Sequence, residues 1–181
     1  MYLDKMISSM EKKTKGVTIR LPNGMIDELQ GYAKQKQISF NTLTNQIFRS
    51  FIEWDSKAID AGWLVFPKRA LRELINAVSE KEVEVISNHC AEFSKDMRLM
   101  MGINDLEGFL ALLKQKGLKS GFGFSETREN DGAIQFVMQH KMGQSWSTFN
   151  KILYSKIIDD LGYIVNIDTT ENTIALNMHP K

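Results

Sequence analysis

The stretch Gly16-Val17-Thr18-Ile19-Arg20-Leu21-Pro22 decides the fold of the N-terminal region. Apolar and polar residues alternate along it, as they do in a β-strand that buries one face. The apolar face consists of Val17, Ile19 and Leu21, and the opposite face of Thr18 and Arg20. Pro22 ends the strand because proline has no N–H to donate to a neighbouring strand. The sequence therefore predicts a short strand with one apolar and one polar face.

Two amphipathic helices are predicted directly after this strand. The first carries apolar residues at helical spacing and ends near Gln37-Ile38, and Ser39 is suited to cap the second. Apolar positions of the two helices include Met25, Ile26, Leu29 and Tyr32, then Leu43, Ile47, Phe48, Phe51 and Trp54. One strand and two short helices cannot pair their backbone groups or cover their apolar stripes alone. We therefore expect this unit to fold with a second copy of itself.

The rest of the chain predicts a separate α+β domain. We assign a basic flexible arm to residues 1–15, the strand–helix–helix unit to 16–56, a linker to 57–67 and the α+β domain to 68–181. Three helices lead this domain: one near 71–78, one opened by a Ser79-x-x-Glu82 capping box, and one that starts at 104–107 and ends at Gly117. The second carries the apolar residues Val83, Ile86, Cys90, Phe93, Met97 and Met100 and could run to Gly102.

Beyond Leu118 the pattern predicts ββαββ. A strand near 119–125, a turn at 130–132 and a strand that places Ile134, Phe136, Met138 and His140 on one face form a hairpin. A helix opened by Ser145 and ended by Gly162 follows, with Trp146, Phe149, Leu153, Ile157 and Leu161 on one stripe. Strands over 163–168 and 173–178 complete the domain. The predicted fold class is α+β.

Composition narrows the classes of function. The chain has 181 residues, with 23 Lys plus Arg against 22 Asp plus Glu, so it is not a strongly basic protein that coats nucleic acid nonspecifically. Its single cysteine, Cys90, excludes an internal disulfide framework and fits a reducing, cytoplasmic location. No stretch is apolar over the roughly 18 residues that a membrane span requires, so we expect no membrane partner.

The segment from Val17 to Trp54 resembles the ribbon-helix-helix repressors, the Arc/MetJ/CopG superfamily of DNA-binding proteins. The resemblance lies in the order and spacing of the strand, the Ile38-Ser39 pair and the two helices. It implies a homodimer in which two strands form an antiparallel ribbon over four helices, with double-stranded DNA as the ligand. The dimer core would contain Val17, Ile19, Leu21, Leu29, Leu43, Ile47 and Phe51.

The same resemblance assigns DNA contacts. Thr18 and Arg20 would read bases in the major groove, where an arginine can bind guanine O6 and N7 together. Gly16 would occupy a third reading position without a side chain. Phosphate contacts would come from the start of the second helix and from the arm, at Lys12, Lys13, Lys15, Ser39, Phe40 and Asn41. The alternatives are a solvated strand face for Thr18 and Arg20, and simple helix capping for Ser39.

The sequence predicts neither an enzyme nor a metal or cofactor site. His89, His140 and His179 are scattered, and no phosphate loop or nucleophile motif is present. The segment 140–147 could line a small-molecule pocket, but we favour a strand-to-helix turn with a buried Trp146, with His140 at the end of its strand. The sequence thus predicts a transcriptional repressor, dimeric or tetrameric, whose C-terminal domain oligomerises or senses a small-molecule or protein effector. The alternative is an antitoxin whose C-terminal part binds a protein toxin.

Overall fold

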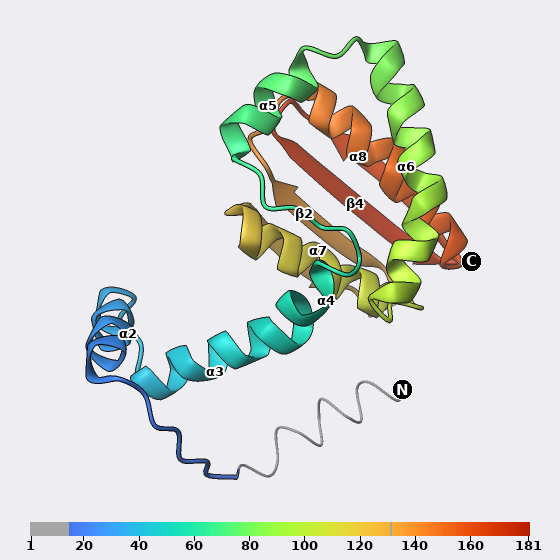
Figure 1. Ribbon diagram of the computed structural model, residues 1–181. Coiled ribbons are helices and arrows are strands. Elements are labelled where there is room, and N and C mark those ends of the chain that lie inside the picture. The colour runs from blue at the N-terminus through green and yellow to red at the C-terminus, as the bar shows by residue number, and fades with distance from the viewer. Residues whose placement is uncertain (1–14, 131) are drawn as a thin grey trace. The chain divides into compact units, whose positions relative to one another are not determined.

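The computed structural model describes residues 15–130 and 132–181 and divides the chain into two compact units, Met1–Arg49 and Ser50–Lys181. We call them the N-terminal unit and the C-terminal unit. Figure 1 shows the elements of each along the chain. Lys12, Lys13 and most of the predicted arm lie outside the described residues. Within the described part of the chain, no helix is long and apolar enough to cross a membrane.

The N-terminal unit contains the two predicted helices, α2 (Asn23–Gln35) and α3 (Phe40–Ser50), the second reaching its boundary. The carbonyl of Pro22 accepts the N–H groups of Met25 and Ile26 as α2 begins. After α2, Gln37 takes a positive φ of 55°, which turns the chain toward the next helix. Ser39 Oγ then accepts the N–H of Thr42 at 3.0 Å, so the predicted helix cap is confirmed.

Residues 15–22, which include the predicted strand, belong to no helix and no strand of the single chain. Val17 is 76% exposed and Ile19 51% exposed, so the apolar face of this segment covers no core in one protomer. A two-stranded ribbon needs hydrogen-bond partners from another strand. The ribbon and the dimer therefore stay predictions.

The chain continues from α3 through a π-helical turn, η1 (Phe51–Asp55), into the short helix α4 (Ser56–Ala58). Trp54 and Ala58 are buried in the core of the C-terminal unit, and the Trp54 ring lies 5.1 Å from that of Trp63. The sequence predicts Trp54 at the end of the second helix and Ala58 in the linker. Both side chains thus belong to the core of the C-terminal unit.

Three helices follow α4 in the C-terminal unit, and they are the three that the sequence predicts ahead of the strands: α5 (Lys68–Asn76), α6 (Glu80–Met100) and α7 (Leu106–Ser120). The capping box is present, because Ser79 Oγ accepts the N–H of Glu82 while the Glu82 carboxylate accepts the N–H of Ser79. Asp105 caps α7 by accepting the N–H of Gly108 at 2.8 Å. These helix starts follow from local hydrogen bonds that the sequence can specify.

The predicted end of α7 is wrong. Gly117 lies inside the helix, which ends at Ser120 with Gly121 in the left-handed conformation at φ 64°. Close packing rather than a helix end explains the glycine at position 117, because a Cβ there would lie 2.8 Å from Cδ1 of Phe124. The following strand, β1 (Gly123–Arg128), accordingly starts later than the predicted 119–125.

The apolar residues of α6 do not all face the core. Ile86, Phe93 and Met100 are 45%, 70% and 59% exposed. The buried positions of α6 are Val83, Ser87, Ala91, Ser94 and Arg98, so Val83 is buried, and Met97 packs partly buried against the core. Figure 1 shows α6 beside α8 (Gln144–Asp160), and the small side chains of Ser87, Ala91 and Ser94 allow the two helices to pack closely. Helix packing, rather than hydrophobicity alone, decides which face turns inward.

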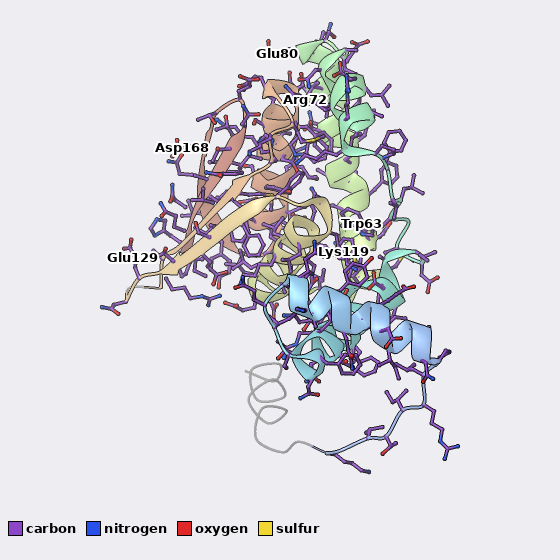
Figure 2. All side chains as sticks on the ribbon, turned by 90° about the vertical axis from the view of Figure 1, so that its left-hand side faces the viewer. Trp63, Arg72, Glu80, Lys119, Glu129 and Asp168 are labelled. Atoms are coloured by element: carbon purple, nitrogen blue, oxygen red, sulfur yellow. The ribbon has the colours of Figure 1, made fainter. Side chains whose placement is uncertain are left out.

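The C-terminal unit ends in the predicted ββαββ arrangement. The strands β1, β2 (Ile134–Gln139), β3 (Tyr163–Thr169) and β4 (Thr173–Pro180) form one antiparallel sheet in the order β1-β2-β4-β3. Gly132, at φ 88°, turns the β1–β2 hairpin, and Figure 2 shows Glu129 at its tip. The fold class α+β is confirmed.

The core lies between one face of this sheet and helices α7 and α8 (Figure 1). Burial alternates along β2 and β4, as expected for an antiparallel sheet with one solvated face. The side chains that form the centre of the core are Phe109, Leu110, Leu113, Phe136, Ile158, Ile174, Leu176 and Met178, each at most 2% exposed. This unit has the core of an independent domain.

Candidate functional site

The predicted base-reading residues lie in the segment before α2. Thr18 and Arg20 are exposed, as is Lys15 of the predicted arm. The neighbouring Val17 and Ile19 are exposed as well, so one protomer alone does not separate a buried face from a reading face. Only a second strand beside residues 16–22 would create that distinction.

The predicted phosphate-binding residues outside the arm gather at the start of α3. Ser39 Oγ caps the helix and lies 2.8 Å from Thr42 Oγ1, so its side chain has a structural role already. Phe40 is 36% exposed and Asn41 is exposed. A helix N-terminus favours an anion through its N–H groups and its dipole. The site is chemically suited to a phosphate, while the capping role of Ser39 needs no ligand.

The predicted dimer core is mostly uncovered in one protomer. Leu43 is 7% exposed, whereas Ile47 is 43% and Phe51 59% exposed, and Leu21 and Leu29 are half-buried. Phe51 also lies past the boundary of the N-terminal unit. Ala33 and Leu43 are the buried apolar residues of residues 15–49. This unit therefore carries more apolar surface than its own fold covers.

The described part of the N-terminal unit is basic. It contains two acidic residues, Asp27 and Glu28, and five cationic residues: Lys15, Arg20, Lys34, Lys36 and Arg49. This local excess of positive charge is not apparent from the net charge of the whole chain, which is +1. A basic unit is attracted to the phosphate backbone of DNA, and the attraction weakens with salt.

A second polar cluster lies where β2 meets α8. His140, fully buried, accepts the N–H of Met142 on Nδ1 at 3.0 Å, and its Nε2 lies 3.0 Å from Ser147 Oγ. Nε2 must then carry the ring proton and donate a hydrogen bond to Ser147 Oγ. The hydroxyl of Ser147 in turn donates a hydrogen bond to the carbonyl of Thr170 at 2.6 Å. The cluster ties the end of β2, the start of α8 and the β3–β4 turn together.

Burial lowers the pKa of His140 from 6.5 to about 4, with smaller contributions from the charges of Lys116 and Lys68. The ring is therefore neutral near pH 7. His140 and Ser147 are residue types that serve as base and nucleophile in hydrolases, but their arrangement differs from a catalytic one. Both are fully buried, and Nδ1 of His140 faces a backbone N–H rather than a carboxylate. We interpret the pair as a structural link. Trp146, predicted as buried in this turn, is only half-buried.

No group of three His, Cys, Asp or Glu side chains within residues 15–130 and 132–181 could hold a metal ion. His89 and His179 are exposed and lie on α6 and β4 respectively. Burial raises the pKa of the Cys90 thiol, which makes it less reactive. These residues do not come together in the fold.

The C-terminal unit contains a partly open cavity of about 420 Å³ that the sequence did not predict. One charged side chain, Lys116, lies among its lining residues on α7. The sequence pattern that indicates this residue is a lysine in the apolar stripe of its helix, because Lys116 follows Phe109, Leu112 and Leu113 at helical spacing. Searches against protein-family models and against curated proteins find no match to this chain.

Proposed function

We propose that the protein is a transcriptional regulator, acting as a repressor, that binds double-stranded DNA as a dimer. In this proposal two copies of residues 16–22 pair into an antiparallel ribbon that enters the major groove. The observation that carries the proposal is the uncovered apolar surface of the basic N-terminal unit. A unit of this order needs a second copy to fold, and its charge suits DNA.

The energetic case for a dimer rests on the exposed apolar side chains. Val17, Ile19, Ile47 and Phe48 are between 43% and 76% exposed in one protomer. Burying a side chain of this kind contributes about 1.5–3 kcal/mol when complete. Two copies bury the set twice, which supports an assembly in which folding and dimerisation are coupled.

Pairing would also divide the segment into two faces. With Val17 and Ile19 turned toward the helices, Thr18 and Arg20 of both copies would project outward. A guanidinium that binds guanine bidentately contributes about 1–3 kcal/mol of discrimination between bases. Lys15 and the start of α3 would add contacts to phosphates that do not depend on sequence.

The test is fluorescence anisotropy of labelled duplexes selected from genomic fragments, at low and moderate salt. Arg20→Ala should weaken binding to the selected duplex by about tenfold or more while changing binding to random DNA little. Lys34→Ala, which removes one charge from exposed α2 surface, is the matched control and should affect both DNAs alike. Equal losses on both DNAs for Arg20→Ala would contradict base reading.

Sedimentation equilibrium tests the dimer separately. The intact protein should sediment as a dimer or tetramer, and Ile47→Glu should dissociate it because a carboxylate would be buried at the interface. A monomeric, folded wild-type protein would overturn the ribbon proposal whatever the DNA result. The C-terminal unit can remain folded in this variant, since its core does not include Ile47.

The antitoxin alternative is less well supported. An antitoxin of this resemblance usually carries a short segment that folds on its toxin, whereas the C-terminal unit has an extensive core of its own. Hydrogen exchange on the isolated protein separates the two ideas. Protection of the amides of β2, β4 and α8 favours the regulator, and rapid exchange across them favours the antitoxin.

A further inference from the structure

The cavity in the C-terminal unit is bounded by α6, α7, α8 and the segment that carries Trp63. Trp63, labelled in Figure 2, precedes α5 in the chain. The cavity measures about 420 Å³, within the range of roughly 300–1,000 Å³ typical of small-molecule sites. The helices α6, α7 and α8 and the segment of Trp63 therefore leave between them a space large enough for an organic molecule.

The walls of the cavity are almost entirely apolar. Aromatic rings dominate them: Trp63, Phe93, Phe109, Trp146 and Phe149 all contribute. The rings of Trp146 and Phe149 stack with centroids 5.8 Å apart on successive turns of α8. Leu112, Leu153 and Met97 supply aliphatic surface. Such walls favour an apolar ligand body because its burial releases water from both surfaces.

Lys116 is the exception among these walls. Its Nζ donates to Tyr154 Oη at 2.9 Å and to Asn150 Oδ1 at 3.2 Å. The same ammonium lies 5.2 Å from the ring centroid of Trp146 and 5.3 Å from that of Tyr154. Asn150 is fully buried and is held by a hydrogen bond from its Nδ2 to the carbonyl of Trp146. The charge is thus fixed in place by neutral groups of the cavity wall.

The charge of Lys116 has no anionic partner among the ion pairs of the described residues. An ammonium has three N–H donors, and the two oxygen acceptors of the wall engage two of them. A positive charge in apolar surroundings is stabilised strongly by an anion and only partly by neutral acceptors. Lys116 therefore offers one donor and an uncompensated charge to a ligand.

We propose that this cavity binds an amphipathic organic anion, a molecule with an aliphatic or aromatic body and one carboxylate that pairs with Lys116. The apolar walls bind the body and Lys116 selects the charge of the head group. All the residues involved belong to the C-terminal unit, so the proposal stands independently of DNA binding.

The first experiment uses the full-length protein and three probes that share one tail: decanoate, decanol and decyltrimethylammonium. Trp63 and Trp146 line the cavity and Trp54 contacts Trp63, so intrinsic fluorescence should respond to an occupant. Cys90, the single cysteine, also lines the cavity, and its alkylation rate gives a second readout. Decanoate should bind about tenfold or more tightly than decanol, and the cation should bind most weakly.

Variants then assign the preference to Lys116. Lys116→Met should lower decanoate affinity about tenfold and leave decanol affinity nearly unchanged, whereas Lys151→Met, on the exposed face of α8, should change neither. Lys116→Glu should reverse the order so that the cation binds better than decanoate. Ala61→Leu should weaken all three probes because it places a larger side chain in the wall.

Each outcome bears on the proposal. Selective, Lys116-dependent binding of decanoate with slower alkylation of Cys90 supports it. Equal affinity for the three probes on the wild-type protein overturns the charge selection without relying on any variant. Absence of binding by all three, with far-UV circular dichroism of a folded protein, overturns the site. None of these results changes the interpretation of the DNA-binding assay.

Discussion

Acid should destabilise the C-terminal unit through His140. In the folded protein the ring is buried and neutral with a pKa of about 4, whereas the unfolded chain has the ordinary value of 6.5. Between pH 4 and pH 6.5 the histidine is protonated in the unfolded chain but stays neutral in the folded protein. As far as His140 is concerned, the free energy of unfolding is therefore highest above pH 6.5 and falls as the pH drops toward 4.

The magnitude follows from the two pKa values. Their difference corresponds to a maximum loss of roughly 3 kcal/mol, and at pH 5 the loss is roughly 2 kcal/mol. Such a loss is a sizeable fraction of the ~5–15 kcal/mol that stabilises a typical domain. Protonation would add a charge near Lys116 and Lys68 and would break the hydrogen bond from the N–H of Met142.

The assay is urea unfolding followed by tryptophan fluorescence at pH 7 and pH 5. All three tryptophans lie in the C-terminal unit, so the signal reports on that unit. His140→Gln removes the titrating group and should lower the free energy of unfolding at pH 7 by about 1–3 kcal/mol, because the buried hydrogen bonds are weakened. His89→Gln, an exposed histidine, is the control.

The decisive quantity is the difference in unfolding free energy between wild type and His140→Gln, compared at the two pH values. Other titrating groups act on both proteins and cancel in this difference. Wild type should lose roughly 2 kcal/mol more than the variant on acidification. A difference that stays constant between pH 7 and pH 5 would refute a neutral, buried His140.

Three further predictions concern the other elements. Gly117→Ala should destabilise the protein by about 1 kcal/mol, since the clash with Phe124 outweighs the better helix propensity of alanine, whereas Gly31→Ala in open α2 surface should raise the melting temperature; thermal circular dichroism measures both. Ser79→Ala should lower the unfolding free energy by about 1 kcal/mol in urea titrations, and an unchanged midpoint would argue against the capping box. Removal of residues 1–15 should reduce DNA affinity evenly across sequences and flatten its salt dependence in anisotropy titrations, while a loss confined to one duplex would show that the arm reads bases.

Local features of the fold could be predicted from the sequence. The caps at Ser39 and Ser79 and the hairpin turn at Gly132 follow from residues within a few positions of one another. The alternating burial of β2 likewise follows from a strand with one covered face. In each case the hydrogen bonds or the periodicity that define the element are local, so the sequence suffices.

Features that depend on distant partners could not be predicted. Gly117 and Gly121 are both plausible helix ends, and the choice depends on the ring of Phe124 packing against Gly117. The exposed Phe93 of α6 is more apolar than the buried Ser87, and close packing on α8 reverses the order that hydrophobicity predicts. Elements separated in the chain decide both outcomes.

The candidate sites divide in the same way. The predicted strand–helix–helix order and the basic character of the N-terminal unit come from the sequence alone, and they carry the DNA-binding proposal. The cavity exists only in the tertiary structure, because α6, α7 and α8 bring residues from Ala61 to Ile157 around one space. The sequence determined which residues are apolar and which are charged. Only packing decided that the charge of Lys116 would face an apolar cavity, because a cavity is the space that several distant elements leave between them.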